Sequence, residues 1–333
     1  MARPFVTPDA NLGVGVTGRC PVLSQWVKMK TNRARQTKRE AVYEDLRPLL
    51  FSIAYRMVGS ASEAEDIVQE AFLRFHRESS EGPEIESPKA WLSTVTTRLS
   101  INHVKSARVR RESYFGTWLP EPLITDTESE GAQNAETADS LSLAFLVLLE
   151  SLGPVERAVF LLREVFDYGY DEIADVVGRS EDNCRQIAVR ARRHVEAKKP
   201  RFEASRKRRE ELARRFFGAV MEGDTEGLIG LLAADVVAYG DGGGKAPASP
   251  RPVFGREKVA RLLLRGRPPA YTSLHHMEVN GQPGALLLDA DGHPVVVISV
   301  DIVDDLVQTV RAVVNPDKLR HLDPDPDPLP PAD

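Results

Sequence analysis

The chain of 333 residues has little of what several protein classes require. Its two cysteines, Cys20 and Cys184, are too few for a disulfide framework or a cysteine-based metal cluster, so we expect no metal and no cofactor. No run approaches the ~20 apolar residues that a membrane helix needs. Glycine, proline, asparagine and arginine interrupt residues 1–25, so no secretory signal is predicted. We therefore expect a cytoplasmic protein without a membrane partner.

Basic residues are missing from one stretch of the chain, and charge is unevenly distributed over the rest. Residues 113–140 hold six acidic and no basic residues, whereas residues 179–215 hold 14 basic and six acidic residues, a local charge of +8. Residues 216–333 hold ten basic and 17 acidic residues, a charge of −7. A basic concentration of this kind predicts nucleic-acid contact even in a chain whose net charge is −5.

Helical periodicity dominates the first two thirds of the chain. The stretch "EAVYEDLRPLLFSIAYRMVG" carries one apolar stripe and stops at Gly59. In the next helix Ser62 and Glu65 have capping-box spacing, and the third opens with Ser87 as N-cap before Pro88. We predict a disordered extension over 1–38, a first helical domain over 39–112, an acidic linker over 113–138 and a second helical domain over 139–199.

Residues 170–197 form the strongest local motif. The apolar residues Ile173, Ala174 and Val177 predict a short helix, Gly178 permits a tight turn, and Ser180 is placed to cap a second helix. Two helices joined in this way predict a helix-turn-helix whose second helix reads a DNA major groove. The outward face of that helix carries Asn183, Arg185, Gln186, Val189, Arg190 and Arg193. A solvated helical hairpin is the plain alternative.

Beyond residue 205 the pattern changes. One amphipathic helix, "ELARRFFGAVMEGD", precedes the strand-like runs "DVVAYG", "HHMEVN", "GALLLDA", "HPVVVISVDIV" and "VQTVRAVV", which Gly, Pro and Asn/Asp turns separate. This pattern predicts an α+β domain over 200–320. The closing "DPDPDPLPPAD" predicts a disordered tail over 321–333.

The two helical domains together resemble a known family. "AEDIVQEAFLRF", "PKAWLSTVTTRLSINHVK" and "LGPVERAVFLLREVFDYGYDEIADVVGRSEDNCRQIAVRARRHV" are similar to regions 2 and 4 of bacterial sigma factors of the extracytoplasmic-function group. The family's usual Arg-Asn-x-x-x-Asp stands here as Thr97-Arg98 and Asn102. The resemblance implies a promoter-specific initiation factor, not an enzyme, whose partners are the beta-prime clamp of core RNA polymerase and promoter DNA, both double-stranded and melted.

The resemblance also implies three sets of contact residues. The helix-turn-helix face reads the −35 element. The −10 element is bound by Asn102, His103, Lys105, Arg108 and Arg110. Core polymerase is bound by Asp66, Gln69, Glu70 and Arg74.

The stretch "DGGGK" (241–245) invites a phosphate-loop interpretation, which fails. That motif requires a glycine where Tyr239 stands and a serine or threonine where Ala246 stands, and the prolines that follow exclude a helix. Together with "NPDKL" and "WLPEP" it resembles instead the sigma factors that carry a SnoaL-like cone domain at the C-terminus, which regulates transcription in cis. The implied interdomain contacts are Trp118, Leu119, Asp241, Gly242, Gly243, Gly244, Lys245, Asn315, Pro316, Asp317 and Lys318.

Two other function classes stay open. A simple repressor or activator needs only the helix-turn-helix. A cone domain can also bind an unknown small ligand or act as an enzyme, with Asp235, Tyr239, His275 and His276 as pocket candidates. A surface turn is the plain alternative for the glycine triplet.

Overall fold

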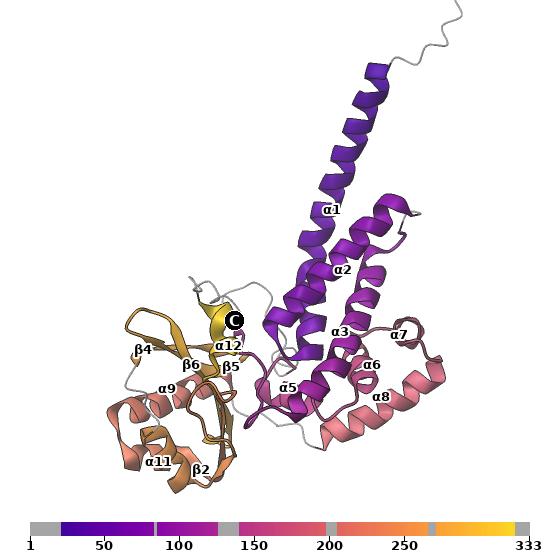
Figure 1. Cartoon of the computed structure of the whole chain (residues 1–333). Coiled ribbons are helices and arrows are strands. Elements are labelled where there is room, and N and C mark those ends of the chain that lie inside the picture. The colour runs from indigo at the N-terminus through magenta and orange to yellow at the C-terminus, as the bar shows by residue number, and fades with distance from the viewer. Residues whose placement is uncertain (1–20, 83–84, 126–139, 198–204, 266–270, 324–333) are drawn as a thin grey trace, which may run out of the picture. The chain divides into compact units, whose positions relative to one another are not determined.

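A computed structural model describes residues 21–82, 85–125, 140–197, 205–265 and 271–323, shown in Figure 1. Side chains are described from residue 40 onward, apart from those of residues 81, 108–112 and 271–272. The chain divides into two compact units, Met1–Leu46 and Arg47–Asp333, and every contact reported below lies within the second. Among the described residues, no helix is both long and apolar enough to cross a bilayer.

Helix α1 (Pro21–Val58) begins earlier than the sequence predicts. The predicted extension over 1–38 is aperiodic, yet its residues 21–38 are helical. The stretch after Pro21 contains neither glycine nor proline until Pro48 and is rich in Lys, Arg and Gln, so intrinsic propensity favours a helix without an apolar stripe. The C-terminal end agrees with the prediction, because Gly59 takes a φ of 70° directly after Val58.

The N-terminus of α2 (Ala61–Glu81) corrects the predicted capping box. Ser60 is the N-cap, and its hydroxyl accepts a hydrogen bond from the Glu63 amide at 3.2 Å. Ser62 does not cap the helix. Its amide and that of Ala61 donate instead to the carboxylate of Glu121 in the linker, at 3.1 and 2.7 Å. A residue distant in sequence therefore supplies the cap that Glu65 was expected to complete.

Helix α3 (Pro88–Glu112) begins as predicted, with Ser87 accepting from the Ala90 amide at 3.3 Å. The second helical domain comprises α5 (Leu143–Leu149), α6 (Pro154–Glu164), α7 (Tyr170–Val177) and α8 (Glu181–Glu196).

The predicted helix-turn-helix geometry is confirmed. Gly178 closes α7 with a φ of 66°, and the Ser180 hydroxyl caps α8. One detail differs, since Val176 is buried whereas the predicted Val177 is only half-buried. The inward stripe of α8 is buried as its spacing predicts, and consists of Cys184, Ile187, Ala188, Ala191 and Val195.

The C-terminal domain begins with α9 (Arg206–Glu222) and α10 (Thr225–Leu231) and contains α11 (Arg256–Arg265) between its strands. All five predicted strands form: β2 (Leu232–Asp241), β4 (Tyr271–Val279), β5 (Gln282–Asp289), β6 (Pro294–Val303) and β7 (Leu306–Val313). The sheet order is β1-β4-β5-β6-β7-β2-β3, antiparallel except for β2 with β7. Helix α12 (Pro316–Leu319) and a 3-10 turn (Arg320–Leu322) follow the last strand.

Two edge strands escaped sequence reasoning. Strand β3 (Val253–Phe254) pairs with β2, and β1 (Ile124–Thr125) pairs with β4 although it belongs to the linker. Two-residue strands carry too little periodicity to be recognised. Their position follows from tertiary contacts.

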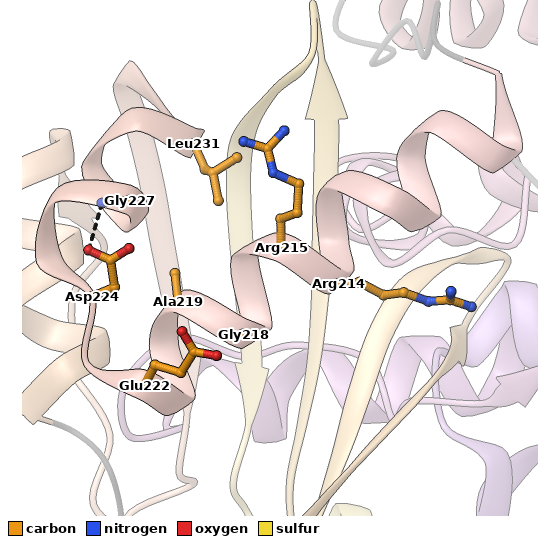
Figure 2. Close-up of a pocket in the computed structure, with 8 residues that line it drawn as sticks. All are labelled: Arg214, Arg215, Gly218, Ala219, Glu222, Asp224, Gly227 and Leu231. Carbon is orange, nitrogen blue, oxygen red and sulfur yellow. Dashed lines mark hydrogen bonds between the residues drawn. The ribbon is translucent and has the colours of Figure 1, made fainter.

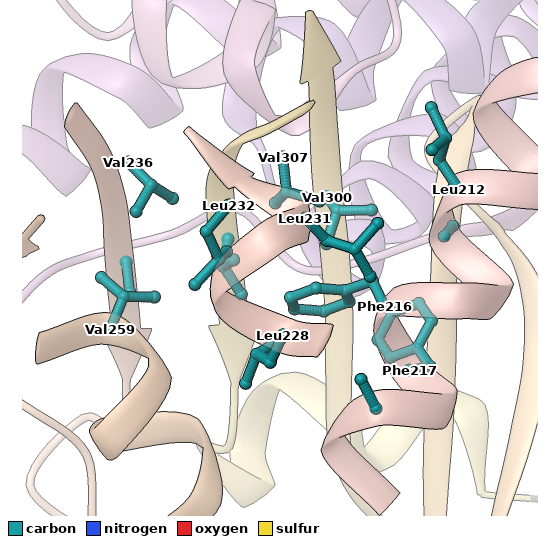
Figure 3. Close-up of a cluster of buried hydrophobic side chains, with 14 of the residues drawn as sticks. Leu212, Phe216, Phe217, Leu228, Leu231, Leu232, Val236, Val259, Val300 and Val307 are labelled. Atoms are coloured by element: carbon teal, nitrogen blue, oxygen red, sulfur yellow. The ribbon is translucent and has the colours of Figure 1, made fainter. Parts of the chain in front are cut away.

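The core of the cone domain fills the space between α9, α10, α11 and the sheet. Figure 3 shows Phe216 and Phe217 of α9 beside Leu228 of α10, with Val300 of β6 and Val307 of β7 across from them. The two phenyl rings meet edge to face, with centroids 5.1 Å apart. Large apolar side chains thus occupy the interior of the helix-covered sheet.

Candidate functional site

The outward face of α8 is built by its cap and its buried stripe. Because Cys184 and Ile187 point into the core, Arg185, Gln186 and Arg190 are exposed on the opposite face. Val189 is exposed too, which is unusual for a large apolar side chain and suits contact with a thymine methyl group. Together with Arg185, Gln186 and Arg190 it lines a surface hollow of about 400 Å³.

The arginines of that face differ in how they are held. The Arg185 guanidinium pairs with Glu181 at 2.7 Å and Asp182 at 2.9 Å, and it lies 5.3 Å from the ring centre of Tyr170. Arg190 and Arg193 are exposed, and Asn183 is half-buried beside the cap. Arg185 is therefore pre-positioned by its own helix.

The predicted polymerase face lies along α2. Asp66, Gln69 and Arg74 are exposed, while Glu70 is half-buried and accepts from Arg74 at 2.7 Å. Sequence reasoning missed Leu73, which is 54% exposed and stands seven residues, two helical turns, after Asp66. Burial of this leucine in a protein–protein contact would add to the apolar core that such contacts contain.

The predicted −10 residues lie on the C-terminal half of α3. Asn102 and Lys105 are exposed, and His103 is half-buried with Nδ1 3.3 Å from the Glu63 carboxylate. The side chains of Arg108 and Arg110 lie outside the described residues. Trp91, near the start of α3, is half-buried and packs against Phe75 with ring centroids 5.7 Å apart.

The middle of α3 packs against the second helical domain. The Arg98 guanidinium donates to the carbonyl oxygens of Asp175 and Val176 at 2.7 and 2.9 Å, at the C-terminal end of α7. The Tyr168 hydroxyl donates to Ser93 at 2.8 Å in a buried contact. Thr97 is fully buried, and its hydroxyl has no hydrogen-bond partner within the described residues. Part of the predicted −10 helix is thus covered by the helix-turn-helix domain.

The linker is held against the cone domain by a buried ion pair. The carboxylate of Asp241, at the end of β2, accepts from the Lys318 ammonium at 2.7 Å and from the Leu119 amide at 2.7 Å. Its other oxygen accepts from the Tyr114 hydroxyl at 2.5 Å. Lys318 also donates to the Leu119 carbonyl. Burial raises the pKa of Tyr114, and the neighbouring Asp241 carboxylate raises it further.

Aromatic and apolar linker residues complete that contact. The Lys318 ammonium lies 4.4 Å from the ring centre of Trp118 and 4.9 Å from that of Tyr114. Leu119 is buried. Gly59, at the end of α1, leaves room for the Trp118 ring, because a Cβ there would lie 2.9 Å from it. The structure thus brings together the predicted residues Trp118, Leu119, Asp241 and Lys318.

The glycine triplet permits close approach. A Cβ on Gly243 would lie 2.2 Å from the Asn315 side chain and 2.9 Å from the Tyr114 hydroxyl. Gly243 and Gly244 both have φ in the left-handed region, at 57° and 74°. A Cβ on Gly242 would meet the Ala246 carbonyl at 2.2 Å. The triplet is therefore a tight turn against which Asn315 and the linker pack.

Lys245 and Asp317 correct one prediction. We expected them to hold the linker, but they pair with each other at 2.7 Å on the exposed surface. Asn315 caps α12 and Pro316 occupies its first turn, so successive side chains of this short helix point in different directions. Lys318 turns inward and Asp317 outward.

The candidates for a small-ligand pocket do not gather at one place. Asp235 accepts from Gln308 at 3.1 Å, Tyr239 lies 5.9 Å from the Arg311 guanidinium, and His275 bonds to Ser273. His276 packs edge to face on Phe217. Figure 2 shows a different hollow of about 440 Å³ between α9 and α10, lined by Arg214, Arg215, Gly218, Ala219, Glu222, Asp224, Gly227 and Leu231.

Comparison with known proteins defines the family. The Sigma-70 region 2 model matches residues 42–110, and the Sigma-70 region 4 model matches residues 142–195. The chain is 37% identical over 288 residues to the ECF RNA polymerase sigma factor SigJ of Mycobacterium tuberculosis, covering 83% of this chain and 91% of the relative. It is 32% identical to the probable ECF sigma factor SigI of the same species, covering 85% and 95%.

A solved structure agrees. The crystal structure of Mycobacterium tuberculosis SigJ is 35% identical in sequence, covers 83% of this chain and 96% of its own, and superposes with a TM-score of 0.66. The chain belongs to the ECF RNA polymerase sigma factors, which direct promoter-specific transcription initiation. The predicted fold class is confirmed as two all-α domains followed by an α+β domain.

Proposed function

We propose that this sigma factor uses the exposed face of α8 to read the −35 element, α3 to bind the −10 strand, and α2 to dock on the clamp of core polymerase. The α8 face carries the −35 assignment, because three side chains suited to base edges and phosphates stand exposed beside Val189. The repressor and fused-enzyme alternatives find no support in the comparisons, since the curated relatives are sigma factors.

The −35 assignment is tested by Arg190→Ala. Loss of a bidentate guanine contact costs about 1–3 kcal/mol and relaxes the preference at one base pair. Anisotropy titration of −35 duplexes at fixed salt measures both effects. Arg192→Ala is the matched control, because Arg192 is exposed on the same helix but pairs with Glu164 at 2.5 Å. Equal affinities for both variants on every duplex would remove Arg190 from the assignment.

The polymerase assignment is tested by charge reversal at Asp66, alone and together with Leu73→Ala. Because both residues are exposed, the fold should be unchanged while co-purification with core polymerase is lost. Glu257→Lys is the control, since Glu257 is an exposed acidic residue that lies on α11 of the cone domain rather than on α2. Retained co-purification of the double variant would place the interface elsewhere.

We propose further that the cone domain regulates initiation in cis by restraining the linker. The buried Asp241–Lys318 pair supports this role, because it binds the amide and the carbonyl of Leu119 in the linker between the two promoter-binding domains. With the linker so held, α3 lies against α7 through Arg98. Releasing the linker should therefore raise the binding of single-stranded −10 DNA.

That regulation is tested with Asp241→Asn, measuring −10 strand binding and run-off transcription with core polymerase. Lys245→Ala is the control, because Lys245 carries a similar charge but contacts Asp317 rather than the linker. An unchanged −10 affinity in Asp241→Asn would reduce the ion pair to a structural contact.

A small ligand of the cone domain is best sought at the hollow between α9 and α10.

A further inference from the structure

One hairpin tip of the cone domain is buried, which is unusual for a turn. The β4–β5 hairpin turns through Asn280 and Gly281, the residue pair that a two-residue turn with left-handed backbone favours. Asn280 has a φ of 53° and is completely buried. By contrast Asp304 and Asp305, at the β6–β7 turn, are left-handed and exposed, as hairpin tips normally are.

The Asn280 side chain uses both its donors and its acceptor. Its amide nitrogen donates to the Tyr55 hydroxyl at 2.7 Å and to the Leu141 carbonyl at 3.0 Å. Its amide oxygen accepts from the Leu123 amide at 2.8 Å, and its own backbone amide donates to the Leu123 carbonyl at 2.8 Å. Such a pattern needs two donors and one acceptor on a short side chain, which only asparagine offers.

The three partners belong to three different parts of the sigma factor. Tyr55 lies in α1 within the region 2 match, Leu123 lies in the linker, and Leu141 directly precedes the region 4 match. Burial raises the pKa of Tyr55, so its hydroxyl stays protonated and donates to the Glu121 carbonyl at 2.6 Å. Arg56 donates to Ser140 beside this cluster, at 3.1 Å.

From this geometry we infer that Asn280 is the positioning residue through which the cone domain holds region 2, the linker and region 4 together. The Asp241–Lys318 pair binds the linker at Leu119, whereas Asn280 contacts all three parts at once. The inference rests on the proposed regulation in cis and names the residue that couples the two promoter-binding domains.

The test removes the side chain and keeps the turn. Asn280→Gly retains the left-handed backbone, because glycine adopts it freely, so the hairpin itself should survive. Each hydrogen bond lost is worth on the order of a fivefold change in population. We expect at least a tenfold loss of the arrangement in which regions 2 and 4 contact each other.

Pulsed electron paramagnetic resonance on the full chain measures that arrangement. Spin labels are placed by Glu78→Cys in α2 and Glu196→Cys in α8, both exposed positions, in a Cys20→Ser background. In Asn280→Gly the distance distribution should broaden and shift. Asp304→Gly is the matched control, since it removes an exposed side chain from the equivalent position of another hairpin.

Two further variants distinguish failure of this inference from failure of the proposed regulation in cis. Tyr55→Phe removes one partner, so its effect and that of Asn280→Gly should combine to less than their sum. Lys318→Met releases the linker by removing a different contact, that of Lys318 with Asp241 and Leu119. If Lys318→Met shifts the distribution and Asn280→Gly does not, the inference is overturned and the proposed regulation stands. If neither variant shifts it, both fall. Circular dichroism that matches the unsubstituted chain confirms that the variants fold.

Discussion

Two lysine–aspartate pairs lie close together in the cone domain and have the same length. Lys318–Asp241 and Lys245–Asp317 are both 2.7 Å, and each joins the "DGGGK" stretch to the "NPDKL" stretch. The first pair is 9% and 0% exposed, the second 58% and 52%. Water screens the second pair and is excluded from the first, so burial rather than distance separates a domain contact from a surface contact.

The buried pair also has partners that the exposed pair lacks. Leu119 and Tyr114 donate to Asp241, and the rings of Trp118 and Tyr114 flank the ammonium. Removing one member of such a pair leaves the other buried and uncompensated, which costs far more than the pair itself contributes.

The largest effect is expected from Lys318→Met. Methionine fills the space but leaves the Asp241 carboxylate without its cation, so the free energy of unfolding should fall by about 3–5 kcal/mol. Urea titration followed by tryptophan fluorescence measures this, because Trp118 lies against Lys318. Lys245→Met is the control. Equal urea midpoints for Lys318→Met and Lys245→Met would show that burial does not distinguish the two ion pairs.

Tyr114→Phe should have an intermediate effect. It removes the hydrogen bond to one oxygen of Asp241 and the acceptor of the Asn315 amide. A hydrogen bond to a charged group contributes about 1.5–3 kcal/mol. In the Asp241→Asn background the same substitution should cost less, and a double-mutant cycle by urea unfolding measures the difference. Strict additivity would show that the two residues act separately.

Lys245→Ala should change the free energy of unfolding by less than about 1 kcal/mol, because both members of its pair are solvated. Whatever effect remains should vanish in about 1 M salt, where the Debye length is ~3 Å. Thermal unfolding at low and high salt tests this, with Asp317→Asn as the reciprocal variant. A large, salt-independent loss would mean that the pair is less solvated than its exposure indicates.

The smallest effect concerns the exposed His293 and its half-buried partner Asp323. His293 lies 2.9 Å from Asp323, and that hydrogen bond and charge raise the pKa of the imidazole above its ordinary value. Its contribution to stability is therefore complete below about pH 6.5 and is lost as the pH rises through the raised pKa. An NMR titration of His293 should show a lower pKa in Asp323→Asn; an identical pKa would exclude this partner.

Local signals in the sequence predicted the local structure well. Gly178 and Ser180 define the helix-turn-helix turn, and strand-like apolar runs bounded by turn residues located all five long strands. Both signals depend on residues within a few positions of each other, so they can be recognised without the fold. The stripe of α8 likewise separated the buried residues from the exposed face that we propose binds DNA.

The contacts between domains could be predicted only in part. The resemblance to sigma factors with a C-terminal cone domain implied that "DGGGK", "NPDKL" and "WLPEP" belong together, but not which lysine turns inward, because that depends on how Asn315 caps α12. Glu121 and Asn280 act on partners 59 to 225 residues away, and neither stands in an apolar pattern. Such residues are recognised by their burial and their partners, which only tertiary structure supplies.

Strand β1 has a consequence for how far the second helical domain can travel. Chain leads from β1, anchored on the sheet at Thr125, to Ser140, and from Ala197 to α9, anchored at Ser205. At full extension these connections span at most about 50 Å and about 28 Å. The second helical domain is therefore tethered to the cone domain at both of its ends. The shorter connection, from Ala197 to Ser205, limits how far that domain can move from the sheet, and separating β1 from β4 would lengthen only the longer connection.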